Sequence, residues 1–111
     1  MVEFTFLLDP SAIHADSPIR SKDMLFAELA TMADRVYGID AAQIEEGLRQ
    51  RESLGTTGFG LGVAIPHART EGLSRPVALV VRPARPIEYD SVDDLPVDLV
   101  FCLLSPASNG A

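Results

Sequence analysis

The segment Val97-Asp-Leu-Val-Phe-Cys-Leu-Leu104 is strongly apolar, and a second run, Val77-Ala-Leu-Val-Val81, is apolar and β-prone without interruption. Runs that are apolar on both faces are typical of central strands covered by helices. Between them, Pro86-Ile-Glu-Tyr-Asp90 alternates weakly between apolar and polar residues. The second half of the chain therefore predicts strands joined by short turns.

A helix is predicted before this strand region, beginning after Ser21 and ending at Gly38. Apolar residues recur at helical spacing between them, with Ser21 as the N-cap and Gly38 as the stop. Met24 and Met32 fall on this apolar stripe, and we expect both in the core. In the preceding residues 1–20 the apolar run is broken by Asp9-Pro10-Ser11, and this mixed segment predicts a short helical turn and a short strand.

A second helix is predicted after Asp40, with Ile44 and Leu48 on its apolar side and an end near Glu52-Ser53-Leu54-Gly55. It is only half apolar, so we expect it to lie on the surface. The order of two helices followed by strands predicts an α/β or α+β sandwich.

Composition limits the size and class of the protein. The chain has 111 residues, enough for one domain with one core, and its 9 Lys+Arg against 16 Asp+Glu give a formal net charge of −7. This acidity argues against sequence-independent nucleic-acid binding and favours a partner with a basic patch. One cysteine, no secretory pattern at the N-terminus and no apolar stretch of the ~20 residues that a membrane span needs predict a cytoplasmic protein.

Glycine is concentrated in Gly55-Thr-Thr-Gly58-Phe-Gly60-Leu-Gly62. The segment lacks the Lys-Ser or Lys-Thr of a Walker loop, and Val63 stands where a dinucleotide-binding fingerprint needs Gly or Ala. Two interpretations remain open. The glycines serve only turns, or their bare backbone N–H groups in Gly58, Gly60 and Gly62 approach an anion.

His67 follows this segment directly after Pro66, with Arg51 before the glycines and Arg69 after them. Proline fixes one φ angle and removes a donor, so we expect His67 at a strand end or edge and exposed. A neutral imidazole nitrogen is a competent nucleophile toward phosphorus, and guanidinium groups stabilise a transferring phosphoryl group. Spacing alone leaves phosphoryl transfer and an ordinary surface histidine about equally plausible.

Other reactive residue types receive plain structural interpretations. Cys102 lies in an apolar run, and we expect a buried small hydrophobe. Asp90, Asp93, Asp94 and Asp98 form no known ligand pattern and predict a solvated acidic turn. No metal site is predicted.

The stretch from Arg51 to Arg69, above all Gly62-Val-Ala-Ile-Pro-His67, resembles the active-site segment of the EIIA domains of the bacterial phosphoenolpyruvate-dependent phosphotransferase system. The similarity is to the fructose/mannitol class and its nitrogen-regulatory relatives. The segment from Pro86 to Phe101 resembles the strand, turn and strand that follow in this family. The resemblance covers about residues 13–106 and implies one domain, 1–111, with an α/β fold: a mixed β-sheet flanked by helices.

The resemblance also implies an activity. His67 matches the histidine that accepts a phosphoryl group from HPr or its nitrogen-branch counterpart, and Arg51 matches an arginine that stabilises the phosphohistidine. Arg69 stands where the family often has a basic residue. From the residues alone, we expect the backbone N–H groups of Gly58, Gly60 and Gly62 to help hold the oxygens. Members pass the group to an EIIB domain or regulate a transporter or sensor kinase. No metal, nucleotide or other cofactor is implied.

Two functional alternatives follow from the resemblance. We expect a phosphocarrier, with a nitrogen- or potassium-type regulator favoured over sugar uptake. The alternative is a regulatory protein-binding module with weak or no phosphotransfer.

Family members continue past the strand matching Val97–Leu104 into a helical region that begins with a second histidine, whereas the present sequence ends at Ala111. We therefore expect a C-terminally shortened domain that lacks the covering helices and self-associates through an uncovered sheet face. His14 lies in a different region and is interpreted as an ordinary strand or loop histidine.

Overall fold

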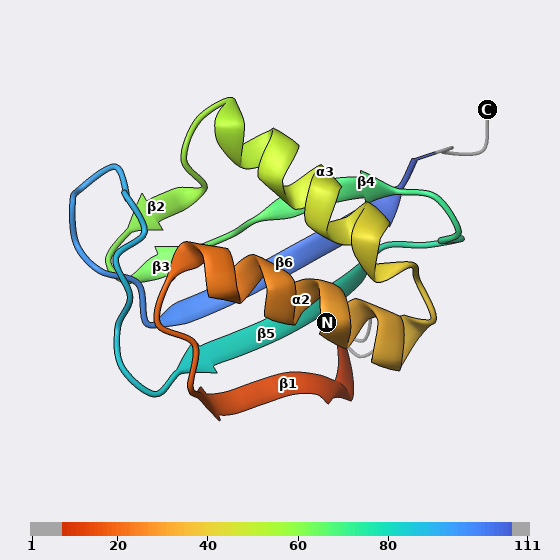
Figure 1. Cartoon of the computed structure of the whole chain (residues 1–111), viewed down its shortest axis with the longest axis horizontal. Coiled ribbons are helices and arrows are strands. Elements are labelled where there is room, and N and C mark those ends of the chain that lie inside the picture. The colour runs from red at the N-terminus through yellow and green to blue at the C-terminus, as the bar shows by residue number, and fades with distance from the viewer. Residues whose placement is uncertain (1–7, 108–111) are drawn as a thin grey trace.

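Two helices lie side by side across one face of a mixed sheet in the computed structural model, which describes residues 8–107 (Figure 1). The helices are α2 (Lys22–Tyr37) and α3 (Ala41–Ser53). The strands are β1 (Leu8–Ser17), β2 (Gly58–Gly60), β3 (Val63–Ala64), β4 (His67–Thr70), β5 (Val77–Pro83) and β6 (Leu99–Pro106). The predicted α/β class with a mixed sheet is confirmed.

The sheet is built around β6, which pairs with three other strands. Within the described part of the chain the six strands run in the order β1-β5-β6-β3-β2, with β4 also paired to β6. β5 is antiparallel to β6, while β3 and β4 are both parallel to it. The two apolar segments predicted as central strands are therefore neighbours, with Leu79 opposite Cys102 and Val81 opposite Val100.

Both predicted helices begin and end as the sequence indicates. The Ser21 hydroxyl accepts a hydrogen bond from the Met24 amide at 3.1 Å, and the Asp40 carboxylate accepts one from the Gln43 amide at 3.1 Å. Gly38 ends α2 in the left-handed conformation, with φ of 70°. These caps fix where the connection between the two helices lies.

The core lies between the helices and the sheet. From α2 it receives Leu25, Phe26, Leu29, Met32 and Ala33, and from α3 Ile44 and Leu48. The prediction for Met32 is confirmed, but that for Met24 is wrong, because Met24 is 46% exposed. It lies on the same helix face as Ala27 and Thr31, which are both exposed, rather than on the face centred on Leu29.

Strand boundaries differ from the predictions at three places. One is the segment 86–90, which forms no strand and contributes only the isolated bridge residue Ile87. The Asp9-Pro10-Ser11 segment lies inside β1, whose pairing with β5 is interrupted by register shifts, and the predicted helical turn is absent from residues 8–17. β1 is an edge strand, where proline is tolerated. The predicted strand from Val97 begins instead at Leu99, since Val97 makes only an isolated bridge with Ile87. The apolar residues 4–7 lie outside the described part of the chain.

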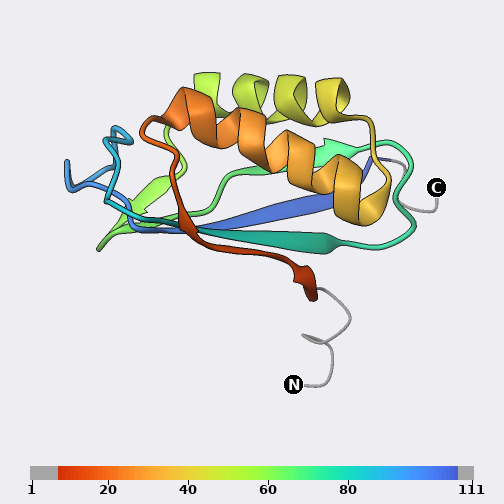
Figure 2. The ribbon, with the colours of Figure 1, turned by 60° about the horizontal axis from the view of Figure 1, so that its bottom comes forward.

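Helices cover only one face of the sheet within residues 8–107, as Figure 2 shows. Leu79, Val81, Val100, Cys102 and Leu104 on the helix-covered face are fully buried, whereas Val80, Phe101 and Leu103 on the opposite face are only half-buried. No helix in the described chain is long and apolar enough to cross a membrane. Self-association through the open face stays a prediction.

Candidate functional site

His67 is the first residue of β4. The Pro66 carbonyl accepts a hydrogen bond from the Leu103 amide at 3.0 Å, and His67 stands opposite Leu103 in the parallel β4–β6 pair. The predicted position at a strand end is therefore confirmed. The side chain is half-buried rather than freely exposed, because the last turn of α3 packs against it.

Gly47 explains how α3 comes this close to β4. A Cβ atom added to Gly47 would lie 3.2 Å from the Ala68 Cβ, so at this position only the Ala68 methyl group lies between the helix and strand backbones. Glycine inside a helix costs about 1 kcal/mol of stability relative to alanine. The close approach of α3 to β4 explains why glycine occupies this position despite that cost. One turn later, the helix presents Arg51 to the histidine next to Ala68.

Arg51 connects His67 in β4 to the loop that follows α3. Its Nε donates to the His67 Nε2 at 3.2 Å, and its Nη1 donates to the Gly55 carbonyl at 2.8 Å. The guanidinium is thus fixed by the loop that follows its own helix. The structure brings together the two residues that the sequence singled out, 16 positions apart in the chain.

The partners of the imidazole define its tautomer. The His67 Nδ1 lies 3.1 Å from the Ile65 carbonyl, which can only accept, so Nδ1 carries the proton. Nε2 faces the Arg51 Nε–H, which can only donate. The lone pair of the neutral ring is therefore on Nε2 and points toward the guanidinium.

These groups line an open cleft of about 390 Å³ between α3 and β4. Arg69 lies on its rim with an exposed side chain. The cleft is lined by Gly47, Gln50, Arg51, Leu54, His67, Ala68 and Arg69. Two guanidinium groups and no carboxylate among these residues make the cleft suitable for an anion.

The three glycines proposed as oxygen-holding groups lie elsewhere, in the β2–β3 hairpin and its turn. An added Cβ would meet the Asp93 carboxylate at Gly60 and the Asp98 carboxylate at Gly62, at 2.9 and 2.8 Å. At Gly58 it would lie 2.4 Å from the Ser91 Oγ. The structure therefore gathers Arg51, Arg69 and His67 at the cleft and leaves Gly58, Gly60 and Gly62 beside the acidic loop.

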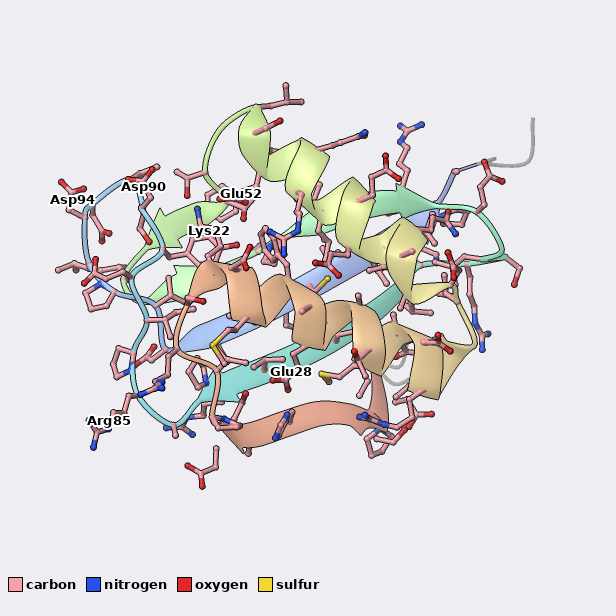
Figure 3. The ribbon with its side chains drawn as sticks, viewed as in Figure 1. Lys22, Glu28, Glu52, Arg85, Asp90 and Asp94 are labelled. Atoms are coloured by element: carbon pink, nitrogen blue, oxygen red, sulfur yellow. The ribbon has the colours of Figure 1, made fainter. Side chains whose placement is uncertain are left out.

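That loop is the solvated acidic turn predicted from the sequence. Asp90, Asp93, Asp94 and Asp98 are all exposed, and Figure 3 shows Asp90 and Asp94 on the outer loop. The Asp93 carboxylate accepts from the Leu61 and Leu95 amides, which lowers its pKa below the ordinary value. Among residues 8–107 no group of three or more His, Cys, Asp or Glu residues could hold a metal ion.

Two further reactive groups are remote from the cleft. Cys102 is fully buried, as predicted, and burial raises the pKa of its thiol. His14 lies in β1 and pairs with Glu28, which also accepts from the Ser17 hydroxyl at 2.7 Å. Neither residue lines the cleft.

Sequence reasoning missed the buried polar residues behind the site, Glu52 and Thr57. The Glu52 side chain is only 8% exposed, and Thr57 is completely buried. In a sequence, a carboxylate beside Arg51 at a helix end looks like surface charge, and a threonine among glycines looks like part of a turn. Burial of an acidic residue appears only when its partners, distant in the chain, are known.

Comparison with known proteins gives a consistent match. The family described as "Phosphoenolpyruvate-dependent sugar phosphotransferase system, EIIA 2" matches residues 6–111. A nitrogen regulatory protein of Bradyrhizobium diazoefficiens is 44% identical over 107 residues, 96% of this chain and 70% of the relative. A fructose-specific EIIA component of Haloferax volcanii is 43% identical over 83 residues, 75% of this chain and 53% of the relative.

Solved structures share the fold. The nitrogen regulatory protein IIA-Ntr of Neisseria meningitidis superimposes with a TM-score of 0.86 at 38% identity, over 93% of this chain and 70% of that one. The mannitol enzyme IIA of Escherichia coli, solved in complex with phosphorylated enzyme IIB, superimposes with a TM-score of 0.74 at 13% identity. The superposition covers 92% of this chain and 74% of that one. The second likeness concerns the fold alone.

Proposed function

Because this chain belongs to the EIIA 2 family of the phosphoenolpyruvate-dependent sugar phosphotransferase system, we propose that it is a phosphocarrier that accepts a phosphoryl group on His67. The observation that carries this proposal is the placement of His67 in the cleft, with its Nε2 3.2 Å from the Arg51 Nε and its Nδ1 3.1 Å from the Ile65 carbonyl. Nucleophile and charge-stabilising cation are already side by side.

In the proposed step, the lone pair of Nε2 attacks the phosphorus of a phosphohistidine on the donor protein. The new bond joins phosphorus to Nε2, and the phosphorus–nitrogen bond of the donor breaks, leaving its electron pair on the donor imidazole. His67 keeps its Nδ1 proton throughout, hydrogen-bonded to the Ile65 carbonyl. The donor is already activated, so positioning and charge stabilisation suffice and no metal or nucleotide is required.

Arg51 has two successive roles in this scheme. In the unphosphorylated protein its Nε–H donates a hydrogen bond to the Nε2 lone pair, which excludes the tautomer protonated at Nε2. When the phosphoryl group arrives, the Arg51 Nε–H donates its hydrogen bond to a phosphoryl oxygen instead of to Nε2. There the guanidinium stabilises the negative charge that develops on the oxygen. Arg69, exposed on the cleft rim, is proposed to attract the donor's phosphoryl group. Gly58, Gly60 and Gly62 are proposed to shape the hairpin rather than to touch the oxygens.

We further propose that the protein acts in the nitrogen branch. Two nitrogen regulatory proteins support this, one 44% identical over 96% of this chain and one 38% identical in a structure that covers 93% of it. The donor would be HPr or its nitrogen-branch counterpart, in the cytoplasm. The phosphorylated form would act on a transporter or sensor kinase, or transfer the phosphoryl group to an EIIB domain. Residues 1–111 would form a single domain.

The test is incubation of the purified chain with phosphoenolpyruvate, enzyme I and HPr or its nitrogen-branch counterpart. We expect an acid-labile phosphoryl group on the wild type and none on His67→Ala. Absence of label from the wild type, or its survival in His67→Ala, would contradict the proposal.

A regulatory binding module is the alternative, favoured by the name of the nitrogen regulatory relatives. The binding-module alternative predicts that wild type and His67→Ala bind the same partner with equal affinity in a pull-down experiment, and that phosphorylation of the wild type does not change this affinity. The phosphocarrier proposal instead predicts that phosphorylation of the wild type changes capture.

A further inference from the structure

A polar cluster of the half-buried Lys22 and the buried side chains of Glu52, Thr57 and Tyr89 lies next to the candidate site. The Glu52 Oε2 accepts from the Lys22 Nζ at 3.0 Å and from the Thr57 amide at 3.1 Å. The Glu52 Oε1 accepts from the Thr57 hydroxyl at 2.6 Å. Figure 3 shows Lys22 and Glu52 pointing toward one another across the gap between α2 and the end of α3.

Tyr89 completes this cluster. The Thr57 hydroxyl has one proton and donates it to Glu52, so the contact at 2.8 Å between the Thr57 Oγ1 and the Tyr89 hydroxyl requires Tyr89 to donate. Burial raises the pKa of Tyr89, which keeps this donor protonated. The Lys22 Nζ also lies 4.4 Å from the centroid of the Tyr89 ring.

Glu52 is held as a carboxylate in this cluster. Burial alone would raise its pKa, but hydrogen bonds from Thr57 and Lys22 outweigh burial and hold the pKa below its ordinary value. A paired carboxylate with directed donors occupies one position, since moving it would leave a buried charge without partners. Glu52 therefore provides a fixed anchor one residue after Arg51.

Main-chain hydrogen bonds connect this anchor to the histidine. The Thr57 carbonyl accepts from the Ile65 amide at 2.9 Å, and the Ile65 carbonyl accepts from the His67 Nδ1 at 3.1 Å. Pro66 between them has a fixed φ angle. Each carbonyl is thus placed by the hydrogen bond that precedes it, from Glu52 through Thr57 and Ile65 to the imidazole.

We propose that Glu52 and Thr57 are positioning residues that set the tautomer and ring orientation of His67 through the Ile65 carbonyl, and so select Nε2 as the reacting nitrogen. This inference rests on the proposed phosphocarrier function. Neither residue touches the reacting atoms. Their effect is transmitted by a carbonyl that must stay aligned with the Nδ1 proton.

The test uses Thr57→Val, which removes the hydroxyl while keeping size and both main-chain hydrogen bonds. Ser17→Ala is the matched control, because it too removes a buried hydroxyl that donates to a glutamate, at 2.7 Å, on the other side of α2. Thr57→Ser retains the hydroxyl and serves as the conservative rescue. All variants are measured in the whole chain.

The first readout is the nitrogen-15 NMR spectrum of the His67 ring in the unphosphorylated protein, at a pH where the ring is neutral. We expect wild type, Thr57→Ser and Ser17→Ala to show Nδ1 protonated and Nε2 unprotonated. Thr57→Val should give a mixture of tautomers. The second readout is the phosphorylation rate with phospho-HPr, which should fall at least about tenfold in Thr57→Val alone.

A single wild-type tautomer together with a wild-type rate in folded Thr57→Val would overturn the proposal, as would equal losses in Thr57→Val and Ser17→Ala. If Thr57→Val does not fold, Glu52→Gln decides by the same readouts, because it keeps the size of the side chain and loses its charge. The NMR readout needs no donor protein. A chain with a Thr57-dependent tautomer that no donor phosphorylates would therefore refute the phosphocarrier function and leave the positioning role intact.

Discussion

The cleft around His67 and the glycine-rich hairpin around Gly60 are only a few residues apart in the sequence, yet they have opposite electrostatic surroundings. Arg51 and Arg69 line the cleft, whereas the hairpin turn lies against Asp93 and Asp98. The Leu61 amide, which an anion could have used, already donates to the Asp93 carboxylate at 2.8 Å. We therefore infer that glycine density marks backbone geometry in the hairpin, and the proposed anion site is the one lined by arginine.

This difference predicts that cleft substitutions change phosphoryl transfer and that hairpin substitutions change stability. Single substitutions in each region separate the two effects.

The largest effect is expected for Arg51→Lys. Lysine keeps the charge but cannot present the Nε–H to the His67 Nε2 while also reaching the Gly55 carbonyl. We expect the phosphorylation rate to fall by roughly 10²-fold with little change in thermal unfolding. Arg69→Lys, on the exposed rim, is the matched control and should lose far less. Equal losses of phosphorylation rate in Arg51→Lys and Arg69→Lys would show that Arg51 has no special role beside His67.

Gly58→Ala should be the most damaging change to the hairpin. The added methyl group would lie 2.4 Å from the Ser91 Oγ and 3.0 Å from the Ser91 Cα, where backbone must move. We expect a loss of about 1–3 kcal/mol in the free energy of unfolding, measured by urea denaturation. The phosphorylation rate of the folded fraction should stay near the wild-type value. A selective loss of rate at unchanged stability would return Gly58 to the phosphoryl site.

Asp93→Asn should weaken the hairpin in a pH-dependent way. The pKa of Asp93 is lowered in the folded protein by hydrogen bonds from the Leu61 and Leu95 amides. The carboxylate therefore contributes stability above its unfolded pKa, and this contribution is lost as the pH falls through the folded value. Thermal melts should separate wild type from Asp93→Asn at neutral pH and converge in acid. A constant difference across this range would contradict the assignment.

Leu61→Asn should give the smallest effect, and a stabilising one. Leu61 has a φ of 58° and is 89% exposed, next to Gly62 with a φ of 83°, so both turn residues are left-handed. Asparagine tolerates this conformation better than leucine and creates the Asn-Gly pair that such turns favour. We expect a gain of up to about 1 kcal/mol in unfolding free energy, with an unchanged phosphorylation rate. Destabilisation would show that the Leu61 side chain has a structural contact.

Much of this architecture could be predicted because its determinants are local. Ser21, Gly38 and Asp40 place the helix boundaries, and the apolar runs place β5 and β6. Helical spacing alone could not decide the orientation of Met24, since the buried face depends on where the sheet lies. The Asp9-Pro10-Ser11 segment predicts a break in regular structure, but pairing with β5 outweighs its turn propensity.

The candidate site was predictable in part for the same reason. The types and order of His67, Arg51 and Arg69 made them candidates, and only the family resemblance favoured phosphoryl transfer over an ordinary surface histidine. The fold brings the three residues to one cleft. The separation of the glycines from the histidine depends on Asp93 and Asp98, more than 30 positions downstream of the glycines that they contact. The cluster of Lys22, Glu52, Thr57 and Tyr89 likewise joins three distant segments. Long-range contacts of this kind leave no local pattern.

The most direct test of the account is to locate the phosphoryl group after reaction with phosphoenolpyruvate, enzyme I and HPr. In protein labelled with nitrogen-15 histidine, we predict coupling between phosphorus and the Nε2 of His67. A phosphoryl group on the Nδ1, on another residue, or no phosphoryl group at all would contradict the assignment of the cleft between α3 and β4 as the reacting site.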